Sequence, residues 1–202
     1  MQDTSKPKLC YTAGGMLIHE GKVLLVKHKK LGIWLNPGGH IDDGELPHEA
    51  AEREFFEETG VQVRAIDSLN LPGTQGNFSL HRKNSGRSGK KNNYTKETLE
   101  VLGFYPNPVS TNLHWVNRES YELRLKSNNP DKRVATKVWK RGCEQHVGFF
   151  YMLEPVNGVE FYQNEEETDG IAWFGPAEIA DLDTHENVRD EIRLGFSLMH
   201  LD

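Results

Sequence analysis

Three glutamates in the first third of the chain have the spacing of a metal-binding helix face. Glu54, Glu57 and Glu58 stand at positions i, i+3 and i+4, so in a helix their side chains share one face. Like charges at this spacing destabilise an isolated helix by about 0.2–0.5 kcal/mol per pair. A divalent cation removes that cost, and Mg2+ and Mn2+ prefer the oxygen ligands that carboxylates offer. The triplet therefore predicts a Mg2+ or Mn2+ site, with a solvated acidic helix face as the alternative.

The residues around these glutamates indicate where the helix begins and ends. Pro47 suits the first helical turn, where its missing N–H would have had no partner. Gly60 suits the position just past the helix end, where the chain often turns left-handed. Arg53 lies four residues after Glu49 and four before Glu57, so it can form an ion pair with either. The sequence thus predicts a short helix whose acidic face is held by an arginine.

The pattern of defined positions continues over residues 39–61. In order, it consists of Gly39, five residues, Glu45, seven residues, Arg53-Glu54-Phe55, one residue, Glu57-Glu58, one residue and Gly60-Val61. This pattern resembles the signature of the Nudix hydrolases, with every defined position filled. The resemblance implies an α/β fold of the Nudix type, an α/β/α sandwich with a mixed sheet. It also implies an enzyme that uses Mg2+ or Mn2+ to cleave the diphosphate linkage of a nucleoside diphosphate joined to another group.

The same resemblance implies roles for individual residues. Four of them would be metal ligands, the last through its main-chain carbonyl: Glu54, Glu57, Glu58 and Gly38. Arg53 and Glu45 would form the pair that orients the ligand carboxylates. The general base stays open, because in some Nudix enzymes it lies in the signature helix and in others on a distant loop. Within the helix, Glu54 and Glu57 are the catalytic candidates.

A second acidic run, Glu165 to Glu167, is the candidate for the distant glutamate. Glu167 stands six residues before Trp173 in Glu-Thr-Asp-Gly-Ile-Ala-Trp. This resembles the Glu-Phe-Asp-Gly-x-x-Trp context of Nudix RNA pyrophosphohydrolases, where the glutamate serves the metals. We therefore expect Glu167 to be a metal ligand and a catalytic residue, with Glu166 or a solvated acidic loop as the alternatives. Asp169 is expected to be a turn residue.

Three histidines near these motifs are not expected to be catalytic. His40 follows the glycine pair and is predicted to be hydrogen-bonded in a turn, with contact to a phosphate as the alternative. His48 is expected to be exposed early in the helix. His146 lies in an apolar run and is expected to be a core residue with its hydrogen bonds satisfied. The metal chemistry is therefore assigned to the carboxylates.

The chain of 202 residues is long enough for one domain with a core, so residues 1–202 are expected to form a single Nudix hydrolase domain. Strands are predicted over residues 8–18, 22–28, 61–69, 100–105, 113–116, 121–125, 145–153 and 170–174, with a shorter one over 158–162. A glycine turn is predicted over 36–39. Helices are predicted over 176–182 and 186–199. This order of elements fits a mixed sheet packed between helices.

Composition limits the compartment and the partners. No apolar stretch approaches the ~20 residues needed to span a bilayer, and the first ten residues lack the apolar run of a secretory signal. A cytoplasmic protein with no membrane partner is therefore expected. Cys10 and Cys143 are expected to be reduced, partly buried thiols, because two cysteines make no disulfide framework, and a disulfide between them is the alternative. A homodimer is compatible with the sequence, since many Nudix proteins pair.

Residues 73–141 form a basic insertion within the domain. They hold 14 Lys and Arg against 5 Asp and Glu, a net charge of +9 in a chain whose total is −6. The stretch 73–96 is rich in Gly, Ser, Asn and Lys and is expected to be flexible. Such a segment could collect a polyanion: an RNA 5′ end, an inositol polyphosphate or a dinucleoside polyphosphate. No RNA-binding motif is present. The alternative is a charged insertion that tunes solubility or forms an oligomer contact.

The predicted reaction is water attack on phosphorus in a diphosphate linkage, with divalent cations bound to the phosphate oxygens and a carboxylate that takes the proton. The substrate would be a nucleoside diphosphate derivative or a related organic polyphosphate. One alternative is a Nudix-fold module that binds a nucleotide without cleaving it, but such modules usually lose signature carboxylates and this chain keeps them. An isomerase of isoprenoid diphosphates is another alternative, and it would need a catalytic cysteine near the site.

Overall fold

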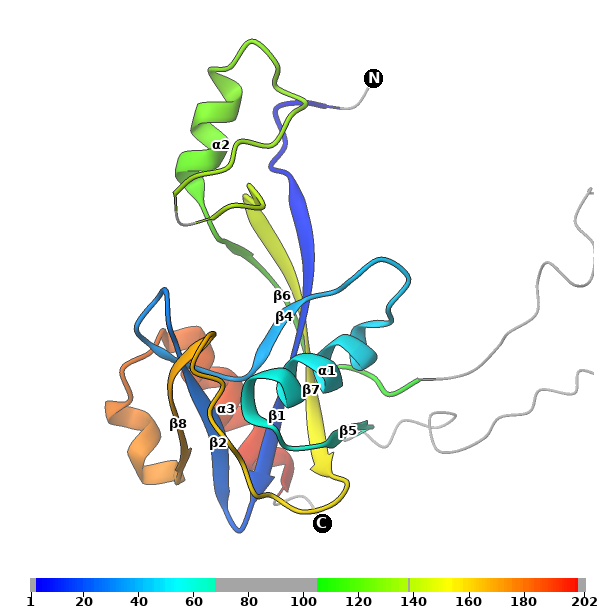
Figure 1. Ribbon diagram of the computed structural model, residues 1–202, viewed down its shortest axis with the longest axis vertical. Coiled ribbons are helices and arrows are strands. Elements are labelled where there is room, and N and C mark those ends of the chain that lie inside the picture. Colours follow the sequence, from blue (N-terminus) through cyan, green and yellow to red (C-terminus); the bar gives the residue numbers. More distant parts are fainter. Residues whose placement is uncertain (1–2, 68–104, 138, 200–202) are drawn as a thin grey trace, which may run out of the picture.

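The computed structural model describes residues 3–67, 105–137 and 139–199, in which eight strands form one sheet (Figure 1). The strands are β1 (Leu9–His19), β2 (Lys22–His28), β3 (Trp34–Leu35), β4 (Gly38–His40), β5 (Val63–Ile66), β6 (Ser110–Trp115), β7 (Gln145–Pro155) and β8 (Thr168–Phe174). The helices are α1 (Pro47–Thr59), α2 (Arg118–Leu125), the 3-10 helix η2 (Pro176–Asp181) and α3 (Glu186–Met199). No helix in these described segments is long and apolar enough to cross a membrane.

Strand β1 is the centre of the sheet because it is the middle strand of the order β3-β2-β1-β7-β5, and it also pairs with β4. It runs parallel to β7, from Leu9 opposite Gln145 to Leu17 opposite Leu153. Its pairings with β2 and β4 are antiparallel, as are those of β2 with β3 and β8 and of β7 with β5 and β6. The sheet is therefore mixed, as predicted.

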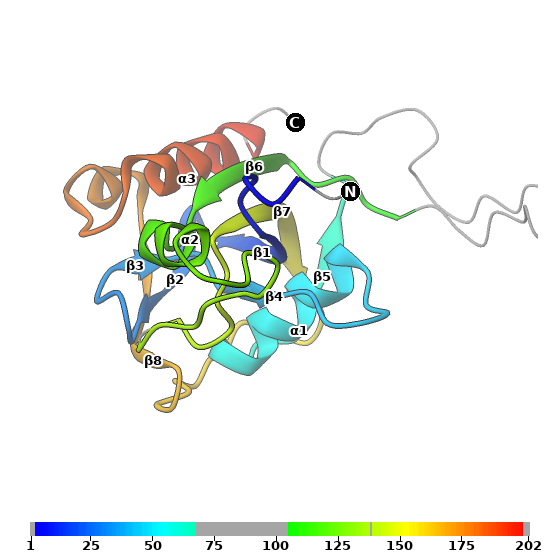
Figure 2. The ribbon, with the colours of Figure 1, turned by 90° about the horizontal axis from the view of Figure 1, so that it is seen from above.

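Successive side chains of the central strands point to opposite faces of the sheet. On β1, Leu17 packs on the face covered by α1, whereas Met16 and Ile18 pack on the face covered by α3. Strand β7 alternates in the same way, with Leu153 on the α1 face and Met152 on the α3 face. Figures 1 and 2 show the two helices on opposite sides of the sheet. This arrangement confirms the predicted α/β/α sandwich.

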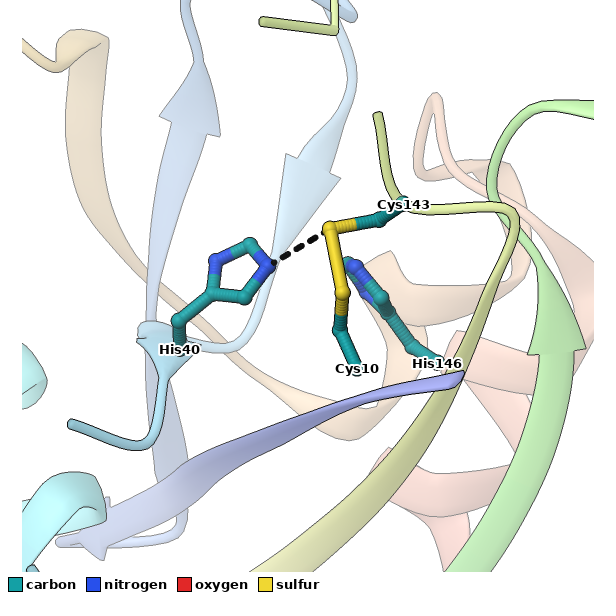
Figure 3. Close-up of side chains that lie close together, drawn as sticks. All are labelled: Cys10, His40, Cys143 and His146. Atoms are coloured by element: carbon teal, nitrogen blue, oxygen red, sulfur yellow. Dashed lines mark hydrogen bonds between the residues drawn. A yellow bond between two sulfur atoms is a disulfide. The ribbon is translucent and has the colours of Figure 1, made fainter. Parts of the chain in front are cut away.

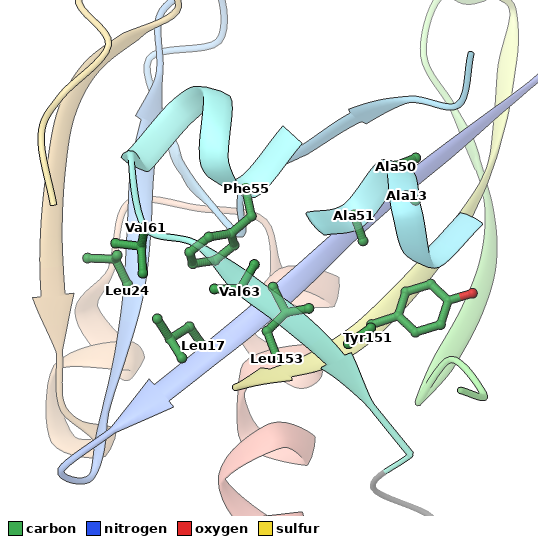
Figure 4. Packing of buried hydrophobic residues seen from close by; sticks show 11 residues of the cluster. Ala13, Leu17, Leu24, Ala50, Ala51, Phe55, Val61, Val63, Tyr151 and Leu153 are labelled. Atoms are coloured by element: carbon green, nitrogen blue, oxygen red, sulfur yellow. The ribbon is translucent and has the colours of Figure 1, made fainter. Parts of the chain in front are cut away.

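Helix α1 is fixed by its caps and by one aromatic side chain. Pro47 occupies the first turn, and the N–H of Leu46 donates to the Glu49 carboxylate at 2.9 Å. Glu49 is thus a cap rather than the partner of the arginine four residues later. Gly60 ends the helix with a φ of 73°, as predicted. Phe55 is fully buried between the helix and the sheet (Figure 4), which contributes about 1.5–3 kcal/mol to stability.

Residues 121–125, predicted as a strand, lie instead in helix α2. Asn117 caps this helix, because its side chain accepts a hydrogen bond from the N–H of Ser120 at 3.1 Å. Ser120 and Arg124 are fully buried and stand four residues apart, the spacing of one helix face. Arg124 donates to the carboxylate of Glu144, with Nη2 3.0 Å from Oε2. The alternation of polar and apolar residues over 121–125 favoured a strand. The buried ion pair of Arg124 with Glu144 is a tertiary contact, and local spacing does not report such a contact.

Several other predictions need adjustment. Residues 158–162, predicted as a short strand, have no regular secondary structure. The predicted turn over 36–39 is partly a strand, because Gly38–His40 forms β4 and pairs with β1. The predicted flexible stretch 73–96 and most of the predicted strand 100–105 lie outside the described residues. The remaining predicted strands and helices are present, with bounds shifted by a few residues.

The described part of the basic insertion is built into the fold. Strand β6 pairs with β7, and helix α2 lies beside the N-terminal residues (Figure 1). Nη1 of Arg124 donates to the carbonyl of Thr4 at 2.6 Å, and its Nη2 donates to the carbonyl of Lys6 at 2.9 Å. Arg124 is therefore a structural cation rather than one available to a polyanion.

Cys10 and Cys143 form a disulfide with their Cα atoms 6.0 Å apart, so the prediction of two reduced thiols is wrong for this structure. The two cysteines are 133 positions apart in the sequence. The parallel register of β1 and β7 explains why they meet, because Cys10 lies opposite His146, three residues after Cys143. The disulfide thus joins the beginnings of the two longest strands.

Candidate active site

The three signature glutamates lie on helix α1 and differ in their exposure to solvent. Glu58 is buried, with 7% of its surface exposed. The side chain of Glu54 is 14% exposed and that of Glu57 is 47% exposed. This carboxylate face (Glu54, Glu57 and Glu58) thus extends from the interior to the solvent. A site of this kind can hold an ion inside and leave room for water and substrate outside.

Arg53 connects the helix to the chain before it and holds two of these carboxylates. Its Nε and Nη2 donate to the two oxygens of Glu45 at 2.7 and 2.9 Å, a bidentate ion pair. Its Nη1 donates to Glu54 at 2.8 Å and to Glu57 at 3.0 Å. Its Nη2 also donates to the main-chain carbonyl of His40 at 2.9 Å. The hydrogen bonds from Arg53 lower the pKa of Glu45, so this pair stays ionised.

The two glycines of β4 allow its backbone to approach both β1 and the carboxylates. A Cβ at Gly38 would lie only 2.6 Å from the carbonyl oxygen of Ala13, and a Cβ at Gly39 would overlap the carboxylate of Glu54. The N–H of Gly38 donates to the carboxylate of Glu58 at 3.3 Å. Gly38 therefore lies beside the buried end of the carboxylate face, and its role as a carbonyl ligand stays a prediction.

Burial and mutual repulsion raise the pKa values of two carboxyls. The pKa of Glu58 is raised to about 8, first by burial and then by the charge of Glu54. The pKa of Glu54 is raised by burial and further by the charges of Glu57 and Glu167, against the lowering effect of Arg53. Acidic groups kept together at such a cost are typical of functional sites.

The loop before β8 brings the distant glutamate to this face. Nδ2 of Asn164 donates to the main-chain carbonyl of Glu57 at 3.1 Å, which ties the loop to the end of helix α1. The charge of Glu167 raises the pKa of both Glu54 and Glu58. The fold thus places Glu167 within electrostatic reach of the signature glutamates, although the two segments are far apart in the sequence.

The donors gathered here fit a hard divalent cation. The candidate ligands are all oxygen atoms, from the carboxylates of Glu54, Glu57, Glu58 and Glu167 and the main-chain carbonyl of Gly38. Mg2+ and Mn2+ prefer oxygen ligands of this kind. The crowding that raises the pKa values of Glu54 and Glu58 would be relieved by a bound cation, which favours the ionised carboxylates.

Two of the three histidines lie beside the disulfide rather than at the carboxylates. Nε2 of His40 is 3.3 Å from Sγ of Cys143, so His40 is hydrogen-bonded as predicted, although to sulfur and from strand β4 rather than from a turn. Nε2 of His146 is buried and has no hydrogen-bond partner among the described residues, so the prediction of a satisfied core histidine is wrong. His48, expected to be exposed, is half-buried and stacks on Tyr105. The grouping of histidines and cysteines was not predicted from the sequence.

Comparison with known proteins identifies the family. The NUDIX domain family model matches residues 9–88. A MutT-like protein from Streptomyces ambofaciens is 34% identical over 126 residues, which cover 60% of this chain and 78% of that protein. The chain belongs to the Nudix hydrolase family. A putative 8-oxo-dGTP diphosphatase from Bacillus subtilis (strain 168) is 47% identical over 56 residues, but that match spans only 26% of this Nudix chain and 38% of the relative.

Solved structures show the same fold. A Nudix family hydrolase from Clostridium perfringens matches with a TM-score of 0.59 and 22% identity, covering 94% of this chain and 97% of that one. The predicted Nudix α/β fold with a mixed sheet is therefore confirmed. The signature in residues 39–61 and the fold of the whole chain therefore indicate the same family. These relatives do not identify the substrate.

Proposed function

We propose that this Nudix hydrolase uses Mg2+ or Mn2+ to hydrolyse a diphosphate linkage in a nucleoside diphosphate derivative. The observation that supports this most is the carboxylate face, where Arg53 orders Glu54 and Glu57 while Glu58 is kept buried with a pKa of about 8. Crowded carboxylates beside a fixed arginine cost stability in the absence of a cation. A module that only bound nucleotides would have no need to keep them.

The chain's own residues would bind and orient the reacting groups. The cation would be held by the carboxylates of Glu54, Glu57, Glu58 and Glu167 and the carbonyl of Gly38. When bound, a divalent cation neutralises charge on the diphosphate and lowers the pKa of the attacking water. Arg53 holds two ligand carboxylates in place and is itself held by Glu45 on both oxygens. Such outer partners fix the direction of the ligands.

Three carboxylates are candidates for taking the proton from the attacking water, and Glu57 and Glu167 are more exposed than Glu54. Glu57 is the most exposed glutamate of the helix face, and Glu167 approaches the same face from the loop before β8. A base must lie within hydrogen-bond reach of the water that it deprotonates. The pH dependence of kcat distinguishes the two more exposed candidates, because the variant without the base (Glu57→Gln or Glu167→Gln) loses the rising limb and the other variant keeps it.

The test of this function is an assay of the purified protein with Mg2+, with Mn2+ and after chelation. The substrates would be nucleoside diphosphate derivatives, 8-oxo-dGTP, dinucleoside polyphosphates, triphosphorylated or capped RNA, and inositol pyrophosphates. We expect metal-dependent release of a cleaved diphosphate product. Glu58→Gln should lose this activity, and Glu122→Gln, on the exposed side of helix α2, should keep it. Binding of a nucleotide with no product from any substrate would instead identify a binding module.

A polyanionic substrate is the second candidate, favoured by the net charge of +9 in residues 73–141. Arg124 is used inside the fold, which lowers the number of cations available to a ligand. If the insertion collects a polyanion, the rate on triphosphorylated RNA should fall steeply with salt while the rate on a nucleotide sugar stays nearly constant. A flat salt dependence on both substrates would exclude this candidate.

A further inference from the structure

A second group of metal-ligating side chains lies near the beginnings of β1 and β7 (Figure 3). This Cys–His cluster consists of Cys10, His40, Cys143 and His146. One donor atom from each residue lies within 4.8 Å of the other three. Cys143 is buried and the other three residues are half-buried. Two sulfurs with two imidazoles form one of the donor sets that structural zinc sites use.

The sheet itself positions these four residues. Cys10 of β1 lies opposite His146 of β7, and Thr12, two residues along β1, lies opposite His40 of β4. Directly paired residues point to the same face of a sheet, as do residues two apart on one strand. Cys10, His40 and His146 therefore share one face, and Cys143 reaches it from the residues just before β7. The positions of Cys10, His40 and His146 thus follow from strand register, and Cys143 is added by the segment just before β7.

His146 provides an independent observation that points to a ligand. Its buried Nε2 lacks a hydrogen-bond partner in the described segments, and leaving such an atom unsatisfied costs about 1–3 kcal/mol. Its ring meets the ring of His40 edge-on, with the centroids 4.9 Å apart. An imidazole with an unpartnered ring nitrogen beside two sulfurs is the kind of side chain that a metal site in this cluster would use.

We propose that the reduced form of this chain binds a Zn2+ ion through Cys10, His40, Cys143 and His146. In tetrahedral zinc sites the metal–ligand bonds of about 2.0–2.3 Å place the ligand atoms about 3.3–3.8 Å apart. The four donors here already lie within 4.8 Å of one another, so small side-chain shifts complete the site. Sulfur and imidazole donors select Zn2+, whereas Mg2+ selects oxygen. The cluster would therefore hold a different ion from the carboxylate face.

Zinc binding requires reduction of the disulfide that the structure contains. A dithiol reductant supplies two electrons and two protons, the S–S bond breaks, both cysteines become thiols, and the reductant becomes a cyclic disulfide. Zn2+ then binds the two sulfurs as thiolates and releases the two thiol protons. Nη1 of Arg133 donates to Sγ of Cys10 at 3.3 Å, and this positive charge favours the thiolate. A disulfide oxidant reverses both steps and releases the ion.

The Cys–His cluster is adjacent to the carboxylate face through strand β4. The side chain of His40 belongs to the cluster, while its main-chain carbonyl accepts the hydrogen bond from Arg53 at 2.9 Å. Gly38 lies two residues earlier on the same strand. Zinc would therefore fix the strand that positions the arginine. The inference goes beyond the proposed hydrolysis and does not depend on it, because zinc content is measured without a substrate.

The experiment measures metal content and cobalt spectra of the full chain. Protein reduced with a dithiol is incubated with Zn2+ in the presence of excess Mg2+, desalted and analysed for zinc by mass spectrometry. We expect about one Zn2+ per chain, with at least a tenfold loss in Cys143→Ser and His146→Gln. Two controls should keep the zinc: Glu58→Gln, which alters the other site, and His19→Gln, which replaces an exposed histidine. In the wild type, Co2+ should give the thiolate-to-metal charge-transfer absorption of a cysteine-bound ion.

The wild-type measurement keeps the proposal testable even if the cysteine variants fail to fold. If the reduced wild type is folded by circular dichroism, retains less than about a tenth of a Zn2+ per chain and shows no charge-transfer band with Co2+, the proposal is wrong. Cys10 and Cys143 would then form a structural disulfide and no metal site. Loss of zinc in Glu58→Gln but not in Cys143→Ser would likewise overturn the assignment, because the ion would lie at the carboxylates.

Discussion

The carboxylate face and the Cys–His cluster both adjoin the three-residue strand β4, and they differ in both donors and construction. The carboxylate face comes from one helix, has only oxygen donors, and ranges from the buried Glu58 to the half-exposed Glu57. The Cys–His cluster comes from three separate strands and the segment just before β7, and its donors are sulfur and nitrogen. Of its four residues, Cys143 is buried. Gly38 adjoins the first group and His40 belongs to the second.

If both groups bind the ions proposed for them, one fold separates two kinds of metal chemistry. An open set of oxygen ligands suits an ion that must also bind water and phosphate. A closed set of sulfur and imidazole ligands suits an ion that stabilises a structure. Arg53 connects the two groups, because it donates both to Glu54 and to the main-chain carbonyl of His40. We therefore expect substitutions in the carboxylate face to change the chemical step directly. Substitutions in the Cys–His cluster should act mainly by shifting β4 and, with it, Arg53.

The largest expected difference is between Glu58→Gln and Cys10→Ser. Glu58→Gln removes a proposed metal ligand and should lower kcat by about 10²–10⁴-fold, because neither the cation nor the water would be held correctly. Cys10→Ser should lower kcat by less than about tenfold, since it acts only through β4. Steady-state kinetics at saturating Mg2+ measures both. Equal losses of kcat in the two variants would contradict the proposed difference between the carboxylate face and the Cys–His cluster.

Arg53→Lys should have the next largest effect. Lysine cannot reproduce the bidentate pair with Glu45 while also reaching Glu54 and His40. We expect kcat and the apparent Mg2+ affinity to fall by about 10–100-fold. Arg193→Lys is the matched control, because Arg193 is half-exposed on α3 and far from β4 in the sequence. Near-normal kinetics in Arg53→Lys would mean that the carboxylates are oriented by something else.

Gly38→Ala tests the strand that the two groups share. The added Cβ would lie 2.6 Å from the carbonyl of Ala13, so β1 and β4 must separate. We expect the free energy of unfolding to fall by about 1–3 kcal/mol, measured by urea denaturation. Gly175→Ala should change it by much less, because its Cβ meets only the flexible Glu178 side chain at 3.4 Å. Equal stabilities of the two variants would show that β4 can move freely.

A pH dependence of stability is expected in the metal-free protein. The pKa of Glu58 is raised from 4.5 to about 8, so between these values the folded protein keeps a proton that the unfolded chain releases. The metal-free stability should therefore fall as the pH rises from 4.5 through about 8. Mg2+ binds the ionised form, so its stabilising effect should grow over the same range. Thermal melts with and without Mg2+ measure this, and a gain that shrinks with rising pH would contradict it.

The sequence predicts the carboxylate face because its determinants are local. The positions of Glu54, Glu57 and Glu58 within one helix follow from the 3.6-residue period, and Pro47 and Gly60 set the helix ends. The same local reasoning failed for helix α2, where the ion pair of Arg124 with a distant residue decides the structure. Local periodicity cannot report such a contact.

The Cys–His cluster could not be predicted because it depends on strand register. Nothing in the sequence states that Cys10 lies opposite His146 or that β4 pairs beside them. The available signal was the Cys143-x-x-His146 spacing, which is short enough for two ligands of one ion but common by chance. The parallel pairing of β1 with β7 supplies the other half, and only the folded structure provides it.

Anomalous diffraction from crystals of the reduced protein soaked in Mn2+ tests the central claim most directly. The account predicts the strongest manganese peak beside the carboxylates of Glu54, Glu57 and Glu58, at about 2.1–2.3 Å from the oxygen ligands. A map with no peak there, or with its strongest peak at Cys10 and Cys143, would contradict the assignment of the divalent cation to the carboxylate face.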